Sequence, residues 1–295
     1  MHWIFLGVYG LIFLAVLTGA AFWSRNRRKT RAPFPENAKL LRGPGETLRK
    51  KLGELDERLI FGVFLAMILP LIVGLGLATI ATKVEGTTHQ AIWLAIAVVG
   101  LMGTLILVIR RLVRSLERWR NTWLGFFGER MVGEALEPLK TAGFRIFHDV
   151  PAGDAKSPFN IDHVIVGPSG VFAVETKTRR KGRARQGYAD HQIVYDGNVL
   201  SYPWGEDRFG LDQAQRQSVW LQAWLEQLLG QPTPVMAILT FPGWMILRRG
   251  RGVVNVLNPR EIPAAVAQRG PAVLDDRQID LVSRQLDVRC RDVEF

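Results

Sequence analysis

Three charged residues lie near the ends of an otherwise apolar stretch, and their types and spacing could support metal-assisted hydrolysis. The run NIDHVIVGPSGVFAVETK, residues 160–177, places Asp162 near one end and Glu175 and Lys177 near the other. Carboxylates provide the oxygen ligands that Mg²⁺ prefers, and a lysine beside them can orient or deprotonate a metal-bound water. This chemistry requires the chain to bring the two acidic residues together.

The same run predicts an antiparallel hairpin that would do so. Its GPSG tetrapeptide at 167–170 has the composition of a four-residue turn, with proline at the second position. β-branched and aromatic residues flank the turn on both sides, as in paired strands. If the two glycines of the turn face each other, Asp162 faces Glu175, and Lys177 shares a side of its strand with Glu175.

Directly opposed carboxylates need a specific explanation. Their Cβ atoms are about 4.5–5.5 Å apart, and like charges at that distance are destabilising, so either one group takes up a proton or a cation lies between them. A divalent metal ion beside Lys177 is one interpretation. The alternative is that Asp162 ends a strand in solvent while Glu175 and Lys177 form a weak surface pair. A register shift of one residue would also separate the carboxylates.

Composition argues against other kinds of site. The 295 residues include a single cysteine, Cys290, which excludes an internal disulfide framework and a thiolate zinc site. The five histidines contain no i,i+3 or i,i+4 pair, so a histidine-based metal site is not expected. The formal charge of +11 suggests nucleic acid, but residues 1–120 hold 17 Lys and Arg against 7 Asp and Glu, whereas residues 121–295 hold 21 against 20. The basic excess therefore belongs to the first part of the chain.

That first part predicts a membrane anchor. Residues 1–24, 59–82 and 86–109 contain no Asp, Glu, Lys or Arg, and about 20 apolar residues span a bilayer as a helix. We therefore expect three transmembrane helices. Buried ionisable residues usually mark transport pathways, and their absence from these runs favours an anchor over a transporter.

The flanking charges predict the orientation. Eleven Lys and Arg fall within a predicted loop at 25–58, and five Arg follow the third span, whereas the connection between the second and third spans has one Lys. By the positive-inside rule, the loop and everything after residue 110 lie in the cytoplasm, and the N-terminus lies outside. We expect a multi-pass protein of a cell inner membrane, with the lipid bilayer as one partner.

Residues 121–295 have the pattern of an α/β domain. We expect a helix at 121–140, a strand at 144–150 and the hairpin described above. Short strands at 192–195 and 198–202 come next, followed by a helix at 212–229 in which Trp220 and Trp224 pack in the core. Buried strands at 234–241 and 252–257 and a helical tail at 260–295 complete the domain.

Within this domain, the stretches GERMVGEALEPLKTAGFRIFHDV, NIDHVIVGPSGVFAVETK and LDQAQRQ resemble the nuclease-related domain, NERD. That family is similar to the PD-(D/E)XK nuclease superfamily, so the resemblance implies a restriction-endonuclease-like mixed sheet flanked by helices. It covers roughly residues 121–242, about two-fifths of the chain, and 243–295 would then be a C-terminal extension of the same domain.

The resemblance also implies site residues. The superfamily's catalytic Asp falls on Asp162, and its (D/E)-x-K motif on Glu175 and Lys177. The helix motif G-x-x-x-E-R makes Glu129 the helix carboxylate, and the later helix supplies Gln213. The implied metal ligands are Asp162, Glu175 and Glu129. The alternatives are that Glu129 lies on an exposed helix face and that Gln213 faces solvent.

The chain departs from the family pattern at three places. Ile161 precedes Asp162 where the superfamily has proline, Thr178-Arg179 stands where family members often have Asn-Trp, and Phe209-Gly210 replaces an Asn-Pro pair. These departures concern the positioning of a substrate more than the proposed metal ligands.

A basic segment follows the proposed site. Its cations could follow a phosphate backbone or could be drawn to the anionic cytoplasmic leaflet; they are Arg179, Arg180, Lys181, Arg183 and Arg185. The resemblance implies a nuclease that depends on Mg²⁺ or Mn²⁺ and cleaves phosphodiester bonds, with DNA as the expected substrate. The alternative is a catalytically silent nucleic-acid-binding or scaffolding module at the membrane.

Overall fold

The computed structural model describes residues 15–16, 18–20, 22–23, 35, 38–268, 270 and 272–294. The elements are, in chain order, β1 (Leu40–Leu41), α2 (Glu46–Ala81), α3 (Thr87–Leu136), α4 (Pro138–Thr141), β2 (Arg145–Asp154), β3 (Ser157–Gly167), β4 (Gly170–Thr176), β5 (Gln192–Tyr195), β6 (Leu200–Tyr202), β7 (Gly205–Asp207), α5 (Phe209–Leu229), β8 (Val235–Thr240), β9 (Met245–Arg248), β10 (Asn255–Leu257), the 3₁₀ turn η1 (Pro259–Glu261), α6 (Ile262–Ala267), α7 (Asp276–Cys290) and β11 (Arg291–Val293).

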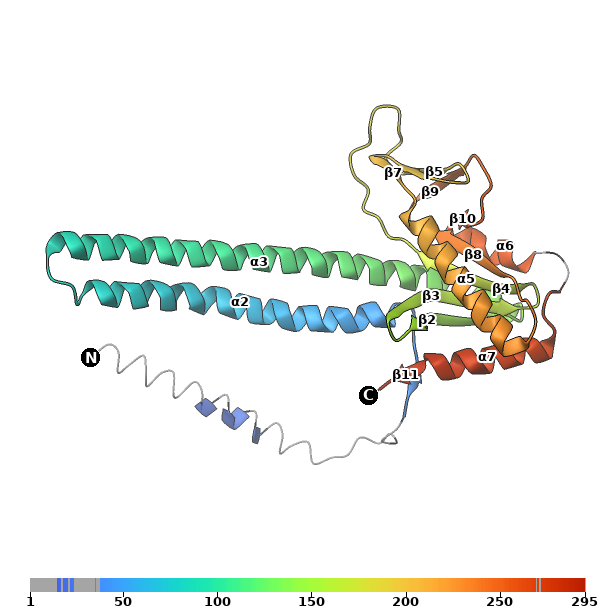
Figure 1. Ribbon diagram of the computed structural model, residues 1–295, viewed down its shortest axis with the longest axis horizontal. Helices are drawn as coiled ribbons and strands as arrows, with labels where there is room; N and C mark the ends of the chain where they lie inside the picture. The colour runs from blue at the N-terminus through green and yellow to red at the C-terminus, as the bar shows by residue number, and fades with distance from the viewer. Residues whose placement is uncertain are drawn as a thin grey trace. The chain divides into compact units, whose positions relative to one another are not determined.

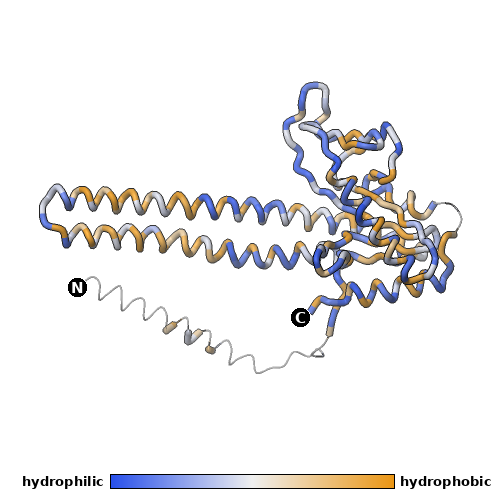
Figure 2. Tube along the Cα trace, viewed as in Figure 1, coloured by the Kyte–Doolittle hydropathy of each residue, from blue (hydrophilic) through white to orange (hydrophobic). Residues whose placement is uncertain are grey.

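α2 and α3 form a long antiparallel helical hairpin (Figure 1). Both are long and apolar enough to cross a membrane, and only 11% of the residues in the most apolar stretch of each are buried. Their ends remote from the sheet are hydrophobic, whereas the ends next to it are mainly hydrophilic (Figure 2). The predicted spans 59–82 and 86–109 fall within this hairpin, and the predicted span 1–24 lies largely outside the described residues.

The hairpin corrects two predicted boundaries. Residues 46–58 belong to α2 and are not part of a loop, and the helix that we expected to begin at residue 121 is the end of α3. The reason is local: residues 104–124 contain neither glycine nor proline to end a helix after the third apolar run. The helix of the proposed anchor and the first helix of the α/β domain are therefore one element.

The main sheet has five strands in the order β10-β8-β4-β3-β2. β2, β3 and β4 form an antiparallel meander, whereas β8 and β10 join parallel to β4 and to each other. The sheet is mixed, as predicted. α5 lies in the connection between β4 and β8, because parallel neighbours need a crossover of this kind.

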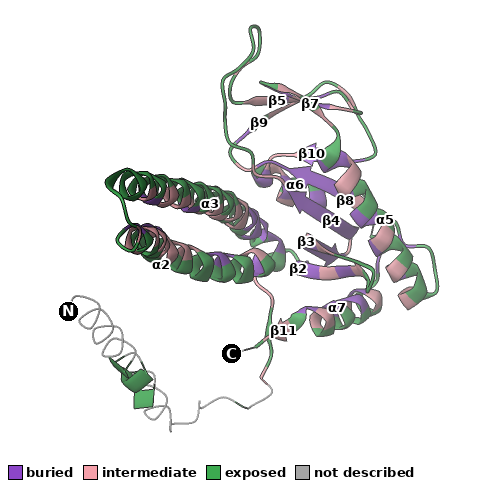
Figure 3. Ribbon diagram, turned by 60° about the vertical axis from the view of Figure 1, so that its left-hand side comes forward, coloured by how far each residue is buried: buried purple, intermediate pink, exposed green. Residues whose placement is uncertain are grey.

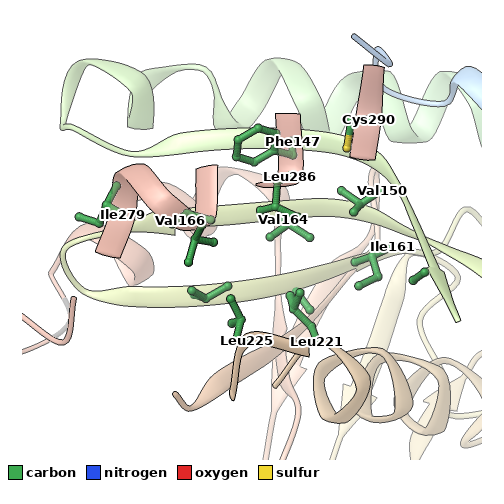
Figure 4. Close-up of a cluster of buried hydrophobic side chains, with 14 of the residues drawn as sticks. Phe147, Val150, Ile161, Val164, Val166, Leu221, Leu225, Ile279, Leu286 and Cys290 are labelled. Atoms are coloured by element: carbon green, nitrogen blue, oxygen red, sulfur yellow. The ribbon is translucent and has the colours of Figure 1, made fainter. Parts of the chain in front are cut away.

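Helices cover both faces of this sheet. Leu221 and Leu225 of α5 and Ile279 and Leu286 of α7 pack on one face (Figure 4). The other face is covered by the end of α3 with α4 and α6; its core cluster comprises Val132, Leu136, Leu139, Phe144, Ile165, Phe172, Val174, Ile238, Ile262 and Val266. The central strands are consequently buried (Figure 3), which accounts for their continuous apolar composition.

A second sheet follows the basic segment, with strand order β7-β6-β5-β9. Its buried aromatic residues are Tyr195 and Tyr202, which pack in one cluster with Phe241 and Trp244. β5 and β6 match the predicted short strands at 192–195 and 198–202. β7 and β9 were not predicted; β7 consists of Gly, Glu and Asp, which are depleted in strands, so its sequence gives no strand signal.

Candidate active site

β3 and β4 pair in the predicted register. The paired residues run from Gly167 with Gly170 to His163 with Val174, and Asp162 and Glu175 come next along the two strands. The carboxylate Oδ2 of Asp162 accepts a hydrogen bond from the backbone N–H of Thr176 at 2.7 Å. The structure thus brings the two acidic residues together at one end of the hairpin, as the turn chemistry predicted.

Glu175 lies in a buried network with Lys177, Gln213 and Gln217. Lys177 Nζ lies 2.6 Å from Glu175 Oε1 and donates to Gln213 Oε1 at 2.8 Å. Gln217 Nε2 donates to Glu175 Oε2 at 2.6 Å. Only 2% of Glu175 is exposed, so the alternative of a weak surface pair is wrong for Glu175 and Lys177. Gln213 is partly buried, and its Oε1 faces the site, where it accepts from Lys177.

The acidic groups of the site resist ionisation. Burial raises the pKa of Asp162 well above its ordinary value, and the charges of Glu175 and Glu129 raise it further. Burial also raises the pKa of Glu175, although Lys177 opposes this effect. Protein atoms therefore surround the carboxyl group of Asp162, while part of the residue still reaches the surface.

Glu129 joins this group from α3, about 20 residues beyond the apolar run. It is 9% exposed, so the alternative of an exposed helix position is wrong. Burial, followed by the negative charges of Asp149 and Glu175, raises the pKa of Glu129 from its ordinary value of 4.5 to about 8. The backbone N–H of Gly45 donates a hydrogen bond to it and opposes that rise.

Small residues let α3 approach the site closely. A Cβ atom on Gly128 would overlap the side chain of Thr178, and one on Gly133 would lie 2.6 Å from Pro44 Cγ. Thr178 replaces the Asn of the family pattern directly after Lys177. The spacing of these glycines therefore sets how near Glu129 can come to the hairpin.

The start of α2 also belongs to the site's surroundings. Asp149, with φ of 49°, has the left-handed backbone that Asp tolerates better than most residues. Its Oδ2 accepts from Thr47 N and Thr47 Oγ1, both at 2.6 Å, and Arg42 Nη1 lies 3.3 Å away. A carboxylate is favourable at this position because unpaired N–H groups and the helix dipole make a helix N-terminus positive. Asp149 therefore supplies the cap of α2 from the sheet.

Two residues that the sequence analysis missed connect these parts. Asn160 Nδ2 donates to Asp149 Oδ1 at 2.8 Å, and its backbone carbonyl accepts from Gln217 Nε2 at 3.1 Å. Gln217 lies four residues after Gln213, on the same face of α5, so the LDQAQRQ run carried a signal for it. A continuous set of hydrogen bonds joins the start of α2 to Glu175.

The carboxyl groups of the site are candidate ligands for a divalent cation. Within the described ranges, no group of three or more His, Cys, Asp or Glu side chains is arranged as a ready metal site. The donor chemistry nevertheless fits Mg²⁺ or Mn²⁺, because three carboxyl groups in a shared buried region oppose one another's ionisation and a bound cation would relieve that repulsion. In this structure, the ammonium group of Lys177 offsets part of the repulsion between the carboxylates.

The predicted nucleic-acid-binding cations lie in the exposed connection between β4 and β5. Arg179 pairs with Asp207 at 3.2 Å, and Arg180 Nη2 donates to the carbonyl of Arg120 at 3.1 Å. Lys181, Arg183 and Arg185 are exposed. The structure therefore separates these five cations from the buried carboxylates, although only one residue stands between Lys177 and Arg179.

Comparison with known proteins supports the family suggested by the motifs. Residues 124–242 match the model of the nuclease-related domain, NERD. No curated protein and no solved structure gave a significant match. The matched range contains Asp162, Glu175, Lys177, Glu129 and Gln213, so the family assignment and the geometry concern the same part of the chain. Residues 124–242 are therefore similar to the nuclease-related domain family.

Proposed function

We propose that this domain is a metal-dependent nuclease that hydrolyses phosphodiester bonds, with DNA as the expected substrate. The observation that carries the proposal is the buried network at the end of the β3–β4 hairpin, where Asp162 and Glu175 meet Lys177. Such a network is costly for a purely structural role, because ionised buried carboxylates destabilise a fold unless a cation compensates them.

The proposed roles follow from the contacts. Asp162 and Glu175 would hold Mg²⁺ or Mn²⁺, directly or through water, and Glu129 would assist from α3. The bound ion would supply stabilisation of phosphate charge and a more acidic water. Lys177 has three N–H donors, and its contacts with Glu175 and Gln213 use two of them. The third can orient a water or a phosphate oxygen. Gln213 fixes the ammonium group, and Gln217 fixes the carboxylate.

One variant pair tests this proposal. Full-length protein in detergent is the right sample, because residues 42–47 contact the site's surroundings. We expect it to cleave DNA with Mg²⁺ or Mn²⁺ and not with EDTA. Glu175→Gln should abolish cleavage, whereas Glu226→Gln, the same change at an exposed position of α5, should have no effect. Folding of each variant is checked by thermal unfolding.

A silent binding module is the second candidate. It is favoured by the lack of a preassembled metal site among the described residues and by the occupied oxygens of Glu175. Calorimetry separates the two functions: a nuclease should bind Mn²⁺ in a manner that Glu175→Gln removes. If the folded wild type binds no Mn²⁺ and cleaves no form of DNA or RNA, the nuclease proposal fails and the silent module remains.

We also propose that α2 and α3 anchor the domain in a membrane, with the domain in the cytoplasm. The support is their exposed apolar surface, since a helix of that composition in a soluble core would be buried. The residues between them, 82–86, would then lie outside.

Cysteine labelling tests this orientation. Burial raises the pKa of the Cys290 thiol to about 12, so background labelling of the native cysteine should be low. Glu85→Cys should react with a membrane-impermeant maleimide in intact cells, and Asp276→Cys only after lysis; the reverse pattern would refute this orientation.

A further inference from the structure

The basic segment after the proposed catalytic lysine has a regular arrangement with aromatic rings. Lys177, Arg179 and Lys181 each lie over an aromatic ring, and so does Arg185 further along the segment. The distances from cation to ring centroid are 5.3 Å for Lys177 over Phe209, 5.6 Å for Arg179 over Tyr202, 5.7 Å for Lys181 over Trp244 and 4.7 Å for Arg185 over Tyr188.

The aromatic rings of this region differ in solvent exposure, and packing alone does not explain the exposed ones. Tyr202 and Trp244 are 1% and 2% exposed and belong to the core of the second sheet. Phe209 is 58% exposed, and Trp204 and Tyr188 are each 40% exposed. Large exposed aromatic residues contribute little to a core, and when they gather on one surface they often mark a binding site.

Trp204 is held in a fixed orientation. Its ring stacks on Tyr202 with centroids 5.5 Å apart and planes 14° apart, and it meets Trp244 edge-on at 5.6 Å. An aromatic ring that is supported on one side and accessible to solvent offers a surface for stacking. Phe209 offers a second such surface directly beside Lys177, at the position where this chain departs from the family's Asn.

We propose that this segment binds single-stranded nucleic acid, leading it along Lys181 and Arg179 to the site at Lys177, with bases stacked on Trp204 and Phe209. The inference deepens the proposed nuclease function and rests on it for the location of the cleaved bond. Cations that follow the backbone, interleaved with exposed rings, are the features that bind single strands with little sequence preference. Paired bases are already stacked within a duplex and could not use these rings.

The anionic leaflet fits this segment less well. Arg180 contacts α3 at Arg120, which lies 11 residues beyond the last residue of the predicted span. At 1.5 Å per residue this is about 16 Å beyond the end of the apolar run, of which the head-group layer takes about 5–8 Å. The remaining distance is comparable with the Debye length of about 8 Å at physiological salt, so screening would weaken attraction to lipid head groups.

Binding is measured without cleavage. Full-length protein in EDTA is titrated into a labelled oligothymidine of about 16 nucleotides, the upper end of the site sizes known for single-strand-binding OB-folds, and into a duplex of equal length. We expect Trp204→Ala to weaken single-strand binding by about tenfold and duplex binding by less than about twofold. Phe209→Ala should act in the same direction. Equal effects on both probes, or none, would overturn the inference.

Trp123→Ala is the matched control. Like Trp204, Trp123 is well exposed (47%) and stacks on another ring, that of Trp119 at 5.7 Å. Its other aromatic contact is with Phe126, which packs on Gly45 at the start of α2 and not on the basic segment. This variant should leave oligothymidine binding unchanged. In nanodiscs, replacing neutral with anionic lipid should also leave the binding unchanged; its loss in anionic discs would show that the segment lies on the leaflet and would overturn the inference.

The two proposals can fail separately. Asp162→Asn should remove cleavage and keep single-strand binding, because Asp162 lies among the carboxylates and not in the basic segment. A wild type that binds through Trp204 and cleaves nothing would refute the nuclease and leave this inference intact. If the wild type cleaves and Trp204→Ala changes the cleavage of no substrate, the inference about Trp204 would be refuted and the nuclease proposal would remain.

Discussion

The buried hairpin end and the exposed basic segment are adjacent in the chain and use the same residue types under opposite conditions. Glu175 is 2% exposed and held by Lys177 and Gln217. Arg179, two residues beyond Lys177, has a side chain that is 38% exposed. A buried charge depends on a few fixed partners, whereas several exposed cations attract an anion together and are screened by salt. Single substitutions should therefore have large effects in the first region and small effects in the second.

The largest effect is expected at Asp162. Replacing it with Asn should lower the cleavage rate by about 10³-fold or more, since metal ions supply several kcal/mol of stabilisation to the transition state. Stability should behave differently: Asn can still accept the hydrogen bond from Thr176 N, and it removes a group whose ionisation burial opposes. Thermal unfolding in EDTA should show an equal or higher Tm. A large fall in both activity and Tm would instead assign Asp162 a structural role.

The next effect concerns pH. The pKa of Glu129 rises from 4.5 to about 8 on folding, so the folded chain holds a proton that the unfolded chain releases between these values. Stability therefore falls as pH rises through this window. Burial lowers the pKa of His148 to about 4 and that of His163 well below 6.5, and this opposes the trend at lower pH. We therefore expect the Tm of metal-free protein to drop between about pH 6.5 and 8, above the ordinary histidine pKa, and Glu129→Gln to reduce the drop.

Glu134→Gln provides the control for that experiment, because Glu134 lies on the same helix with a side chain that is 75% exposed. Its pH dependence of Tm should follow the wild type. Identical slopes for the wild type and Glu129→Gln would contradict the proposed cost of burying this carboxyl group.

A smaller effect is expected where α3 meets the start of α2. In Gly133→Ala, the new methyl group would lie 2.6 Å from Pro44 Cγ, and overpacking of this kind costs about 1–3 kcal/mol. Gly53→Ala is matched, because Gly53 is also inside a helix and has nothing within 4 Å of its Cβ position. It should stabilise the protein by about 0.5–1 kcal/mol. Both free energies of unfolding are obtained by denaturant titration in detergent, and an unchanged value for Gly133→Ala would show that Pro44 moves freely.

The sequence predicted the buried hairpin well because its information is local. The turn at 167–170 and the strand-forming residues on both sides of it fix the register that places Asp162 near Glu175. The start of α2 could not be predicted in the same way. Gly45 provides no side-chain cap, and the carboxylate that binds this helix end belongs to Asp149, about 100 residues later in the chain.

The surroundings of the site show the same limit. Gln213 was identified through the family motif, whereas Gln217 required knowing that α5 presents this face to Glu175. The aromatic partners of the basic segment come from β6, α5 and the residues before β9, which the chain brings together only in the folded second sheet. Local patterns thus predicted the hairpin and the strands of the main sheet, whereas β7, β9 and the long-range contacts around the site were not predicted.

The smallest effect is expected in the exposed segment. Arg183→Ala removes one cation among several, so binding of oligothymidine should weaken by only about twofold, and the dependence of log Kd on log salt should become shallower by about 0.7, the contribution of one phosphate contact on a single strand. Titrations at several salt concentrations measure both quantities. A loss as large as that of Trp204→Ala would mean that Arg183 has a specific partner on the nucleic acid, and the segment would then resemble the buried site more than a shared electrostatic surface.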